Sequence, residues 1–145
     1  MSVDIEVVRT VTDEIVRAFG VLLPQLSRSA VPLDERALRT LVAWQGNRLL
    51  VARVDGAIVG ALTLVMFPIP TGLRAWIEDV VVDETVRGQG IGAALTVEAV
   101  RLARADGART IDLTSRPSRQ AANRLYERLG FQARDSRVYR LADGQ

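Results

Sequence analysis

Three glycines lie close together in the segment Arg87-Gly-Gln-Gly-Ile-Gly92, which joins a predicted strand to a predicted helix. Glycine lets the backbone turn tightly and lets a ligand approach without a Cβ in the way. The free amides and the dipole at the start of the helix favour an anion, and Arg87 adds a fixed positive charge. The segment predicts an anion-binding turn. The alternative is a tight strand-to-helix turn that holds no ligand.

Two common phosphate-binding motifs do not account for this turn. Gly88-x-Gly90-x-x-Ala93 fits a relaxed dinucleotide fingerprint, with Asp112 about 20 residues further on. A dinucleotide-binding domain would place most of its strands after Asp112, where only 33 residues remain. The Walker motif requires a lysine, and all 19 basic residues of this chain are arginine. We therefore expect a different phosphate-bearing ligand.

Two carboxylates, Glu78 and Asp79, interrupt an otherwise apolar predicted strand. Side chains alternate across a strand, so Glu78 is expected on the face of Val80 and Val82, and Asp79 on the other face. Partial loss of water there would raise the pKa of Glu78 toward that of a useful general base. Glu78 is therefore the first candidate for a catalytic base.

Other roles and other bases compete with this assignment. The alternative for Glu78 is a salt bridge, for example with Arg74. Asp79 is expected to be a structural partner of an arginine or of a helix start. Asp112 interrupts a short apolar strand in the way that Glu78 does. The sequence leaves open whether Glu78, Asp79, Asp112 or a water molecule is the base.

The residue types that are missing restrict the chemistry. The chain has 145 residues, no Cys and no His, and it also lacks Lys. These absences exclude disulfides, thiolate nucleophiles, Ser-His and Cys-His relays and Schiff bases, and no structural zinc site is expected. Proton transfer must use carboxylates, tyrosine, water or the chain amine. The formal net charge is +2, but residues 101–145 hold ten Arg and five acids, which favours an anion near this region.

The order of the predicted elements indicates one α/β domain with a mixed sheet, positioned around the glycine-rich turn. Strands are predicted at 3–9, 47–54, 57–67, 74–82 and 109–114, with one or two more at 131–141, and helices at about 13–27, 34–44, 91–105 and 118–129. Asp55-Gly56 predicts a hairpin turn and residues 68–72 a loop. Residues 115–118 are expected to cap the last helix and Gly130 to end it. Trp44 and Trp76 are expected in the core.

Two segments together resemble the GNAT superfamily of acetyl-CoA-dependent N-acetyltransferases. Arg87-x-x-Gly90-x-Gly92, after Val80-Val-Val82 and before a helix, is similar to the family's acetyl-CoA loop. Ala122-Asn-Arg-Leu-Tyr126-Glu-Arg-Leu-Gly130-Phe131 is similar to the family's helix with Asn and Tyr, followed by Gly-Phe. The resemblance implies a single domain over 1–145, α/β (α+β), with a mixed, mostly antiparallel central sheet flanked by about four helices. Residues 12–45 match only as two helices.

The resemblance implies transfer of an acetyl group from acetyl-CoA directly to a primary amine of a small molecule or peptide, with no covalent enzyme intermediate and no metal. The pyrophosphate would be held by backbone amides of Arg87, Gly88, Gln89, Gly90, Ile91 and Gly92. The segment of Val80, Val81 and Val82 would contact the cofactor, with the backbone of Val80 and Val82 pairing with the pantetheine. An amide near Val80 would stabilise the oxyanion, and Asn123 would contact CoA.

Tyr126 is the candidate general acid that protonates the leaving thiolate. A phenol titrates near 10 and a thiol near 8.5, so tyrosine enters the reaction protonated. Asn123 lies one helical turn before it, so both side chains project from one face. The alternative role for Tyr126 is that of a core aromatic. Arg116 and Arg119 are weaker candidates for contacts with the acceptor or the CoA phosphate.

Competing functions and partners remain open in the sequence. The rival function is a non-catalytic CoA-binding regulator with the same fold. A nucleic-acid module has only the arginine-rich C-terminal third in its favour, and no nucleic acid or membrane partner is expected. The N-terminus has no signal-peptide pattern, so a cytoplasmic protein is expected. Homodimers are common in the resembling family. The acceptor is a polyamine, amino sugar, amino acid, drug or peptide.

Overall fold

The computed structural model describes residues 2–142 and divides the chain into two compact units, Met1–Thr114 and Ser115–Gln145. Each unit is described by itself. The first unit contains the sheet and three of the α-helices, and the second contains one α-helix. No helix among the described residues is long and apolar enough to cross a membrane.

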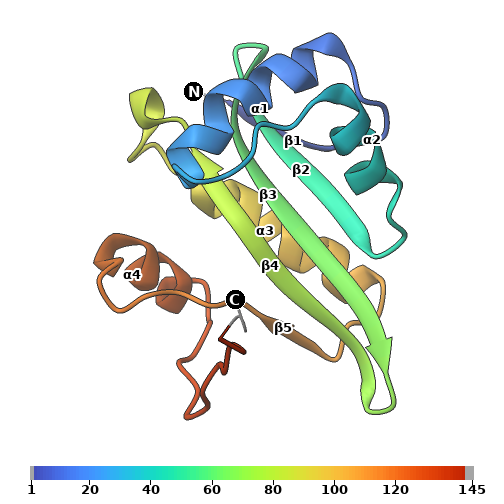
Figure 1. The fold of residues 1–145 in the computed structure, drawn as a ribbon. Helices are drawn as coiled ribbons and strands as arrows, with labels where there is room; N and C mark the ends of the chain where they lie inside the picture. The colour runs from blue at the N-terminus through green and yellow to red at the C-terminus, as the bar shows by residue number, and fades with distance from the viewer. Residues whose placement is uncertain (1, 143–145) are drawn as a thin grey trace. The chain divides into compact units, whose positions relative to one another are not determined.

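The first unit is built on a five-stranded sheet whose strands follow the order of the chain. The strands are β1 (Val3–Val7), β2 (Asn47–Val54), β3 (Ala57–Ile69), β4 (Gly72–Val82) and β5 (Thr110–Asp112). Strands β1 to β4 are antiparallel to their neighbours, and β5 is parallel to β4 (Figure 1). The prediction of a mixed, mostly antiparallel sheet with four α-helices is confirmed.

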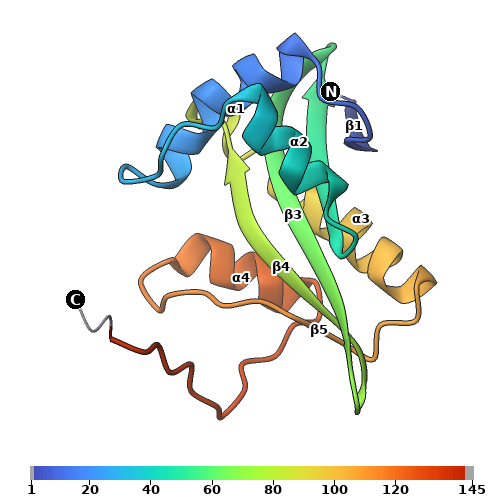
Figure 2. The same cartoon turned by 45° about the vertical axis from the view of Figure 1, so that its right-hand side comes forward.

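Helices cover both faces of this sheet. Helices α1 (Asp13–Leu26) and α2 (Glu35–Ala43) lie on one face, and α3 (Ile91–Ala105) lies on the other (Figure 2). The α1 helix begins where the Thr12 side chain accepts a hydrogen bond from the Ile15 amide, and Asp34 caps α2 in the same way. The predicted helices at about 13–27 and 34–44 are therefore confirmed, with each bound within one residue of its predicted position.

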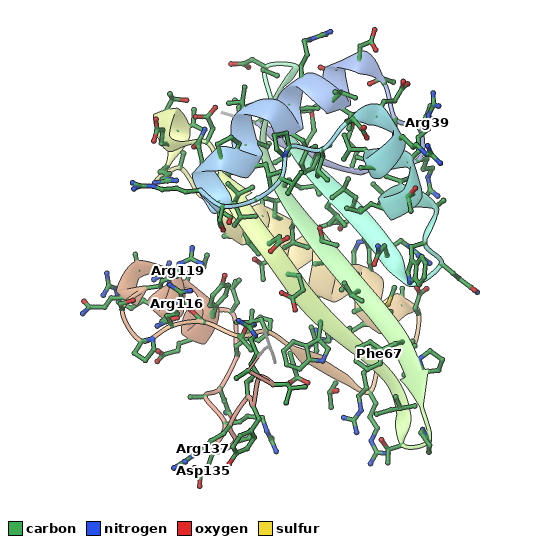
Figure 3. The ribbon with its side chains drawn as sticks, in the orientation of Figure 1. Arg39, Phe67, Arg116, Arg119, Asp135 and Arg137 are labelled. Carbon is green, nitrogen blue, oxygen red and sulfur yellow. The ribbon has the colours of Figure 1, made fainter. Side chains whose placement is uncertain are left out.

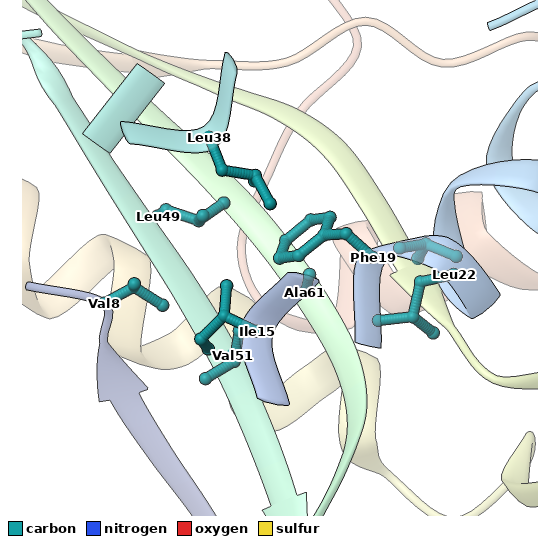
Figure 4. Close-up of a cluster of buried hydrophobic side chains, with 9 residues drawn as sticks. Val8, Ile15, Phe19, Leu22, Leu38, Leu49, Val51 and Ala61 are labelled. Carbon is teal, nitrogen blue, oxygen red and sulfur yellow. The ribbon is translucent and has the colours of Figure 1, made fainter. Parts of the chain in front are cut away.

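A hydrophobic core fixes α1 and α2 on the sheet (Figure 4). Ile15, Phe19 and Leu22 recur at the helical spacing that turns one side of α1 inward, and Leu38 does the same for α2. They pack against the sheet residues Leu49, Val51, Ala61 and Val81. Burying such side chains stabilises the fold by about 1.5–3 kcal/mol each, which holds β4 in place under α1.

The second unit is organised around α4 (Gln120–Arg128). Gly130 follows the helix with φ of 100°, and its N–H donates to the Glu127 carbonyl while the Phe131 N–H donates to the Tyr126 carbonyl. These two bonds form a Schellman motif, and the Tyr126 and Phe131 rings meet edge to face with centroids 6.0 Å apart. The predicted end of the helix at Gly130 is confirmed.

Several local predictions are wrong. The predicted loop at 68–72 is shorter, because Pro68 and Ile69 continue β3 and pair with β4. Ser118 does not cap α4, since the capping residue is Arg119 and makes no side-chain cap. Trp44 ends α2 with 67% of its surface exposed, while Trp76 is half-buried. No strand forms among the described residues 131–142.

Candidate active site

A bulge in β4 sets the geometry of the candidate site. Thr63 of β3 pairs with Glu78, but Ala61 pairs with Val81, so two residues of β4 face the single residue between Ala61 and Thr63. Asp79 is the extra residue and has φ of 51°, a left-handed conformation that is costly for a residue other than glycine. The regular alternation predicted for this strand therefore ends at Glu78.

The bulge corrects the predicted faces of the strand. Glu78 shares a face with its partner Thr63, and after the bulge Val81 takes that face and packs in the core under α1. Val82 pairs with Gly60, which approaches α3 closely, so Val82 lies on the opposite face. The prediction that Glu78 shares a face with Val82 and Val80 is wrong, because the extra residue shifts the alternation by one position.

The same bulge turns backbone groups of β4 toward an open edge. Strand β5 pairs with β4 only over residues 74–76, so the rest of β4 has no strand beside it on that edge within the first unit. The Asp83 N–H donates to the Val59 carbonyl at 2.8 Å, which directs Asp83 toward β3. Backbone groups alternate in direction along a strand, so those of Val82 and Val80 face the open edge. The Arg87 Nε reaches the Val82 carbonyl from that side at 3.2 Å.

The glycine-rich turn follows directly and leaves its amides available. Gly88 and Gly90 both have φ of 81°, and a Cβ on either residue would meet nothing within 4 Å. Gly90 is the N-terminal cap of α3 and has no side chain to bond the first amides of the helix. The first helical N–H with a backbone partner is that of Ala94, which donates to the Gly90 carbonyl. An exposed helix start with free N–H groups and Arg87 beside it fits a phosphate.

The turn residues divide into backbone and side-chain contributors. Ile91 is 1% exposed and packs its side chain in the core, so only its amide can serve a ligand. Arg87 and Gln89 have exposed side chains. Val81 is also buried in the core and pairs with Ala61 of β3, so neither its side chain nor its backbone groups face the open edge.

An arginine that the sequence analysis did not single out lies near this turn. Arg28 and Arg87 both line a polar surface hollow of about 430 Å³, between the end of α1 and the short 3-10 helix η1 (Glu84–Val86). The Glu84 carboxylate lines the same hollow, and the remaining excess of positive charge favours an anionic ligand. Arg28 stands in an ordinary loop segment after a helix, so no sequence signal distinguishes it from other surface arginines.

Glu78 has the environment of a candidate base. Arg74 donates to the hydroxyl oxygens of Thr110 and Thr71, at 2.9 and 2.8 Å, and among the described residues Glu78 makes no ion pair. The salt bridge with Arg74 considered above is therefore not formed. The Glu78 side chain is exposed, but partial desolvation at the sheet, followed by the nearby Asp79 carboxylate, raises its pKa.

Asp79 lies next to a small apolar cavity. The cavity has a volume of about 40 Å³ and is bounded by α1, α2 and the sheet. Asp79 and Thr63 contribute its polar wall, so Asp79 does not lie on the face opposite Glu78 as predicted. Asp112, the third candidate base, pairs with Trp76 in the parallel register of β5 and is half-buried.

The remaining predicted residues belong to the second unit. Tyr126 is 8% exposed, and burial raises the pKa of its phenol while Arg119 opposes the shift. The Asn123 side chain accepts a hydrogen bond from the Ser115 hydroxyl and donates to the Arg116 carbonyl at 3.0 Å. Asn123 thus holds the segment before α4, where Arg116 and Arg119 lie (Figure 3). The structure groups Glu78, the open edge and the glycine-rich turn in one unit, and Asn123 and Tyr126 in the other.

Several known proteins are similar to this chain in sequence and in fold. A glucosamine 6-phosphate N-acetyltransferase of Trypanosoma brucei brucei is 38% identical over 86 residues, which are 57% of this chain and 56% of that protein. The chain thus aligns with little more than half of this relative. A solved acetyltransferase of Trypanosoma brucei is 29% identical, with a TM-score of 0.80 and 97% and 99% of the two chains covered. A solved transcriptional regulator of Bacillus halodurans C-125 is also 29% identical, with a TM-score of 0.77 and 96% and 99% coverage.

The family assignment rests on a sequence match that covers most of the chain. The sequence model of the acetyltransferase (GNAT) family matches residues 13–131, which include β4 with its bulge, the glycine-rich turn and α4. The resemblance predicted from residues 87–92 and 122–131 is therefore confirmed. The chain belongs to the acetyltransferase (GNAT) family.

Proposed function

We propose that this chain transfers the acetyl group of acetyl-CoA directly to a primary amine. The observation that carries the proposal is the open edge of β4 leading into the turn amides that have no partner within the described chain. A pantetheine arm is extended and has amide groups, so it suits a free strand edge, and a pyrophosphate suits a helix start. The cofactor supplies a reactive thioester.

Residues of the first unit would hold the cofactor. The N–H and C=O groups of Val80 and the N–H of Val82 are available along the edge, whereas the Val82 carbonyl accepts from Arg87. The amides from Gly88 to Gly92 would bind the pyrophosphate, and Arg87 and Arg28 would neutralise its charge. Asn123 already uses both ends of its amide group within the second unit, so a contact with CoA would have to share or replace these bonds.

The transfer needs two protons to leave the amine nitrogen and one proton to reach the leaving thiolate. Glu78, directly or through water, would take the proton from the incoming ammonium, so that the amine nitrogen can attack the thioester carbon. An amide near Val80 would stabilise the oxyanion. As the C–S bond breaks, Tyr126 would donate its proton to the leaving thiolate, and the second proton of the amine nitrogen, passed through water, would restore the phenol. The raised pKa of Glu78 favours its assignment as the base, and the raised pKa of Tyr126 keeps the phenol protonated before it donates.

Release of free thiol from acetyl-CoA over a panel of amines tests this function. The panel includes glucosamine 6-phosphate, the acceptor in the name of the curated relative, together with polyamines, amino acids, alkylamines and an N-terminal peptide. We expect thiol release that depends on at least one amine, with mass spectrometry showing acetylated product. Thiol release that no amine in the panel stimulates would argue against an acetyltransferase.

A non-catalytic CoA-binding regulator is the second candidate, because one solved relative is named a transcriptional regulator. A regulator needs the cofactor site but neither a base nor an acid. Tight binding of CoA by calorimetry, combined with no acetylation of any amine, would favour it over the enzyme. The isolated Glu78 with its raised pKa supports the enzyme.

A further inference from the structure

The small cavity under α1 and α2 is not needed to hold acetyl-CoA. Leucine and phenylalanine side chains of both helices form most of its wall, and Ala61 and Val81 form its floor on the sheet. It lies on the sheet face that Val81 and Glu78 share, and not on the strand edge. The cavity is therefore placed to receive a group that approaches from the acceptor side of the thioester.

One end of this cavity is polar. Asp79 and Thr63 line it there, and every other lining side chain is apolar. The left-handed backbone of Asp79 is costly for aspartate, and the bulge keeps that residue beside the cavity. Glu78 is its neighbour in sequence and is free of ion pairs among the described residues. An apolar space with the Asp79 carboxylate in its polar wall complements an ammonium group that carries an aliphatic chain.

The volume of the cavity limits the length of the aliphatic chain that it can hold. A buried water needs about 10–15 Å³ of such volume, so a cavity of about 40 Å³ holds roughly three non-hydrogen atoms. An acyl chain longer than acetyl would also fit by volume. An acyl chain carries no cation, however, and would place apolar atoms against the carboxylate without compensating its negative charge. The charge at the polar end thus favours the amine acceptor over a longer acyl group.

We propose that the cavity between α1, α2 and β4 binds the short aliphatic chain of a primary alkylamine, whose ammonium group lies at Asp79 and Glu78. This inference rests on the proposed acetyl transfer, since it names the class of acceptor for that site. The chain of such an acceptor has about three carbon atoms next to the amine. A larger polar acceptor such as an amino sugar phosphate would leave the cavity unfilled.

Calorimetry with the 145-residue chain and saturating CoA measures this binding without any reaction. The probes are methylamine, ethylamine, n-propylamine, n-hexylamine and glucosamine 6-phosphate. Each buried CH₂ group is expected to improve the affinity about 4-fold from methylamine to n-propylamine, after which the gain stops. An affinity that does not depend on chain length would overturn the inference.

Two variants test the cavity itself. Ala61→Val fills the floor and should remove the preference for n-propylamine over methylamine. Ala103→Val is the matched control, because Ala103 is equally buried but belongs to α3 and not to the cavity. Leu33→Ala, at a half-buried loop position of the wall, should shift the preference toward n-hexylamine. Folding of each variant is checked by circular dichroism.

The outcomes separate this inference from the proposed function. Chain-length-dependent binding that Ala61→Val abolishes supports the cavity even if no amine is acetylated, and in that case the proposed function fails alone. Acetylation of amines with no dependence on chain length, or equal effects of Ala61→Val and Ala103→Val, leaves acetyl transfer intact and overturns the cavity inference. If Ala61→Val does not fold, Leu33→Ala takes its place as the test. A shift of preference toward n-hexylamine then supports the cavity inference, and no shift overturns it.

Discussion

Tyr126 has the protonation state that a general acid needs. Its phenol is buried and its pKa is raised, so it stays neutral at physiological pH and can donate to a thiolate. The same burial is equally compatible with a packing role beside Phe131. Substitution by phenylalanine separates the two roles, because it removes the proton and keeps the ring.

Tyr126→Phe is expected to lower kcat by about 10²-fold and to leave the affinity for acetyl-CoA nearly unchanged. Steady-state thiol release and calorimetry with acetyl-CoA measure the two effects. Tyr139→Phe is the matched control, because Tyr139 is 86% exposed. A Tyr126→Phe enzyme with the turnover of the parent would reduce Tyr126 to a packing residue.

Glu78 is expected to control the acidic limb of the pH–rate profile. Its pKa is raised, so as the pH falls the carboxylate takes up a proton earlier than an ordinary glutamate with a pKa of 4.5. The protonated form cannot accept a proton from the amine, so activity should fall with the pH through that raised value. Glu78→Gln should lower turnover and abolish this limb.

Asp112→Asn serves as the comparison for Glu78→Gln, because Asp112 lies on the neighbouring strand β5. If Asp112 only contributes to the structure, its variant keeps the acidic limb in profiles of kcat measured from pH 5 to 9. Loss of the limb in Asp112→Asn, with its retention in Glu78→Gln, would transfer the role of base to Asp112.

At the scale of elements, the glycine-rich turn gives α3 the N-terminal amides that we propose bind the pyrophosphate. Gly90 and Gly107 mark the two ends of this helix with nearly equal φ angles, 81° and 84°, and both have open space where a Cβ would be. Valine at either position should therefore cost a similar 1–2 kcal/mol of stability from the left-handed backbone. Only position 90 borders the proposed pyrophosphate site.

Gly90→Val should consequently weaken acetyl-CoA binding by at least ~10-fold, since a new Cβ would stand where the phosphates approach. Gly107→Val should bind like the parent protein. Isothermal titration calorimetry and thermal melts of both variants provide the measurement. Equal affinity in the two variants would show that the turn does not hold the cofactor.

The elements that depend on local signals could be predicted from the sequence. The helices α1 and α2 begin within one residue of their predicted starts, Asp55-Gly56 forms the hairpin turn, and Gly130 ends α4, because each depends on signals within a few residues. The bulge at Asp79 could not be predicted, since it depends on how β4 registers against β3. Its consequence, the face that Glu78 shares with Val81, escaped prediction for the same reason.

The segment after α4 is predicted to contain strands that the structure does not form over residues 131–141. Residues 131–141 alternate enough apolar and polar side chains to predict strands, but no strand forms over the described residues there. A strand requires a neighbour to satisfy its backbone groups, and alternation alone does not supply one. Val138, Tyr139 and Leu141 are exposed instead.

At the scale of the whole molecule, the prediction of a single domain over residues 1–145 stays open. The chain divides at Thr114 into a large unit with the sheet and a small one with α4. A nine-residue helix is marginal in water by itself, and a unit so short cannot bury enough surface for an independent core. We therefore expect both units to unfold together in one cooperative transition.

The aromatic residues allow this expectation to be tested in the intact chain. Both tryptophans, Trp44 and Trp76, belong to the first unit, and both tyrosines belong to the second. Tryptophan fluorescence therefore follows the first unit, and the NMR signals of the buried Tyr126 ring follow the second, with exposed Tyr139 as an internal reference. Coincident thermal midpoints are expected for a single two-state domain. A Tyr126 transition at a lower temperature than the tryptophan transition would mean that the proposed general acid and the proposed cofactor turn lie on separately folding parts.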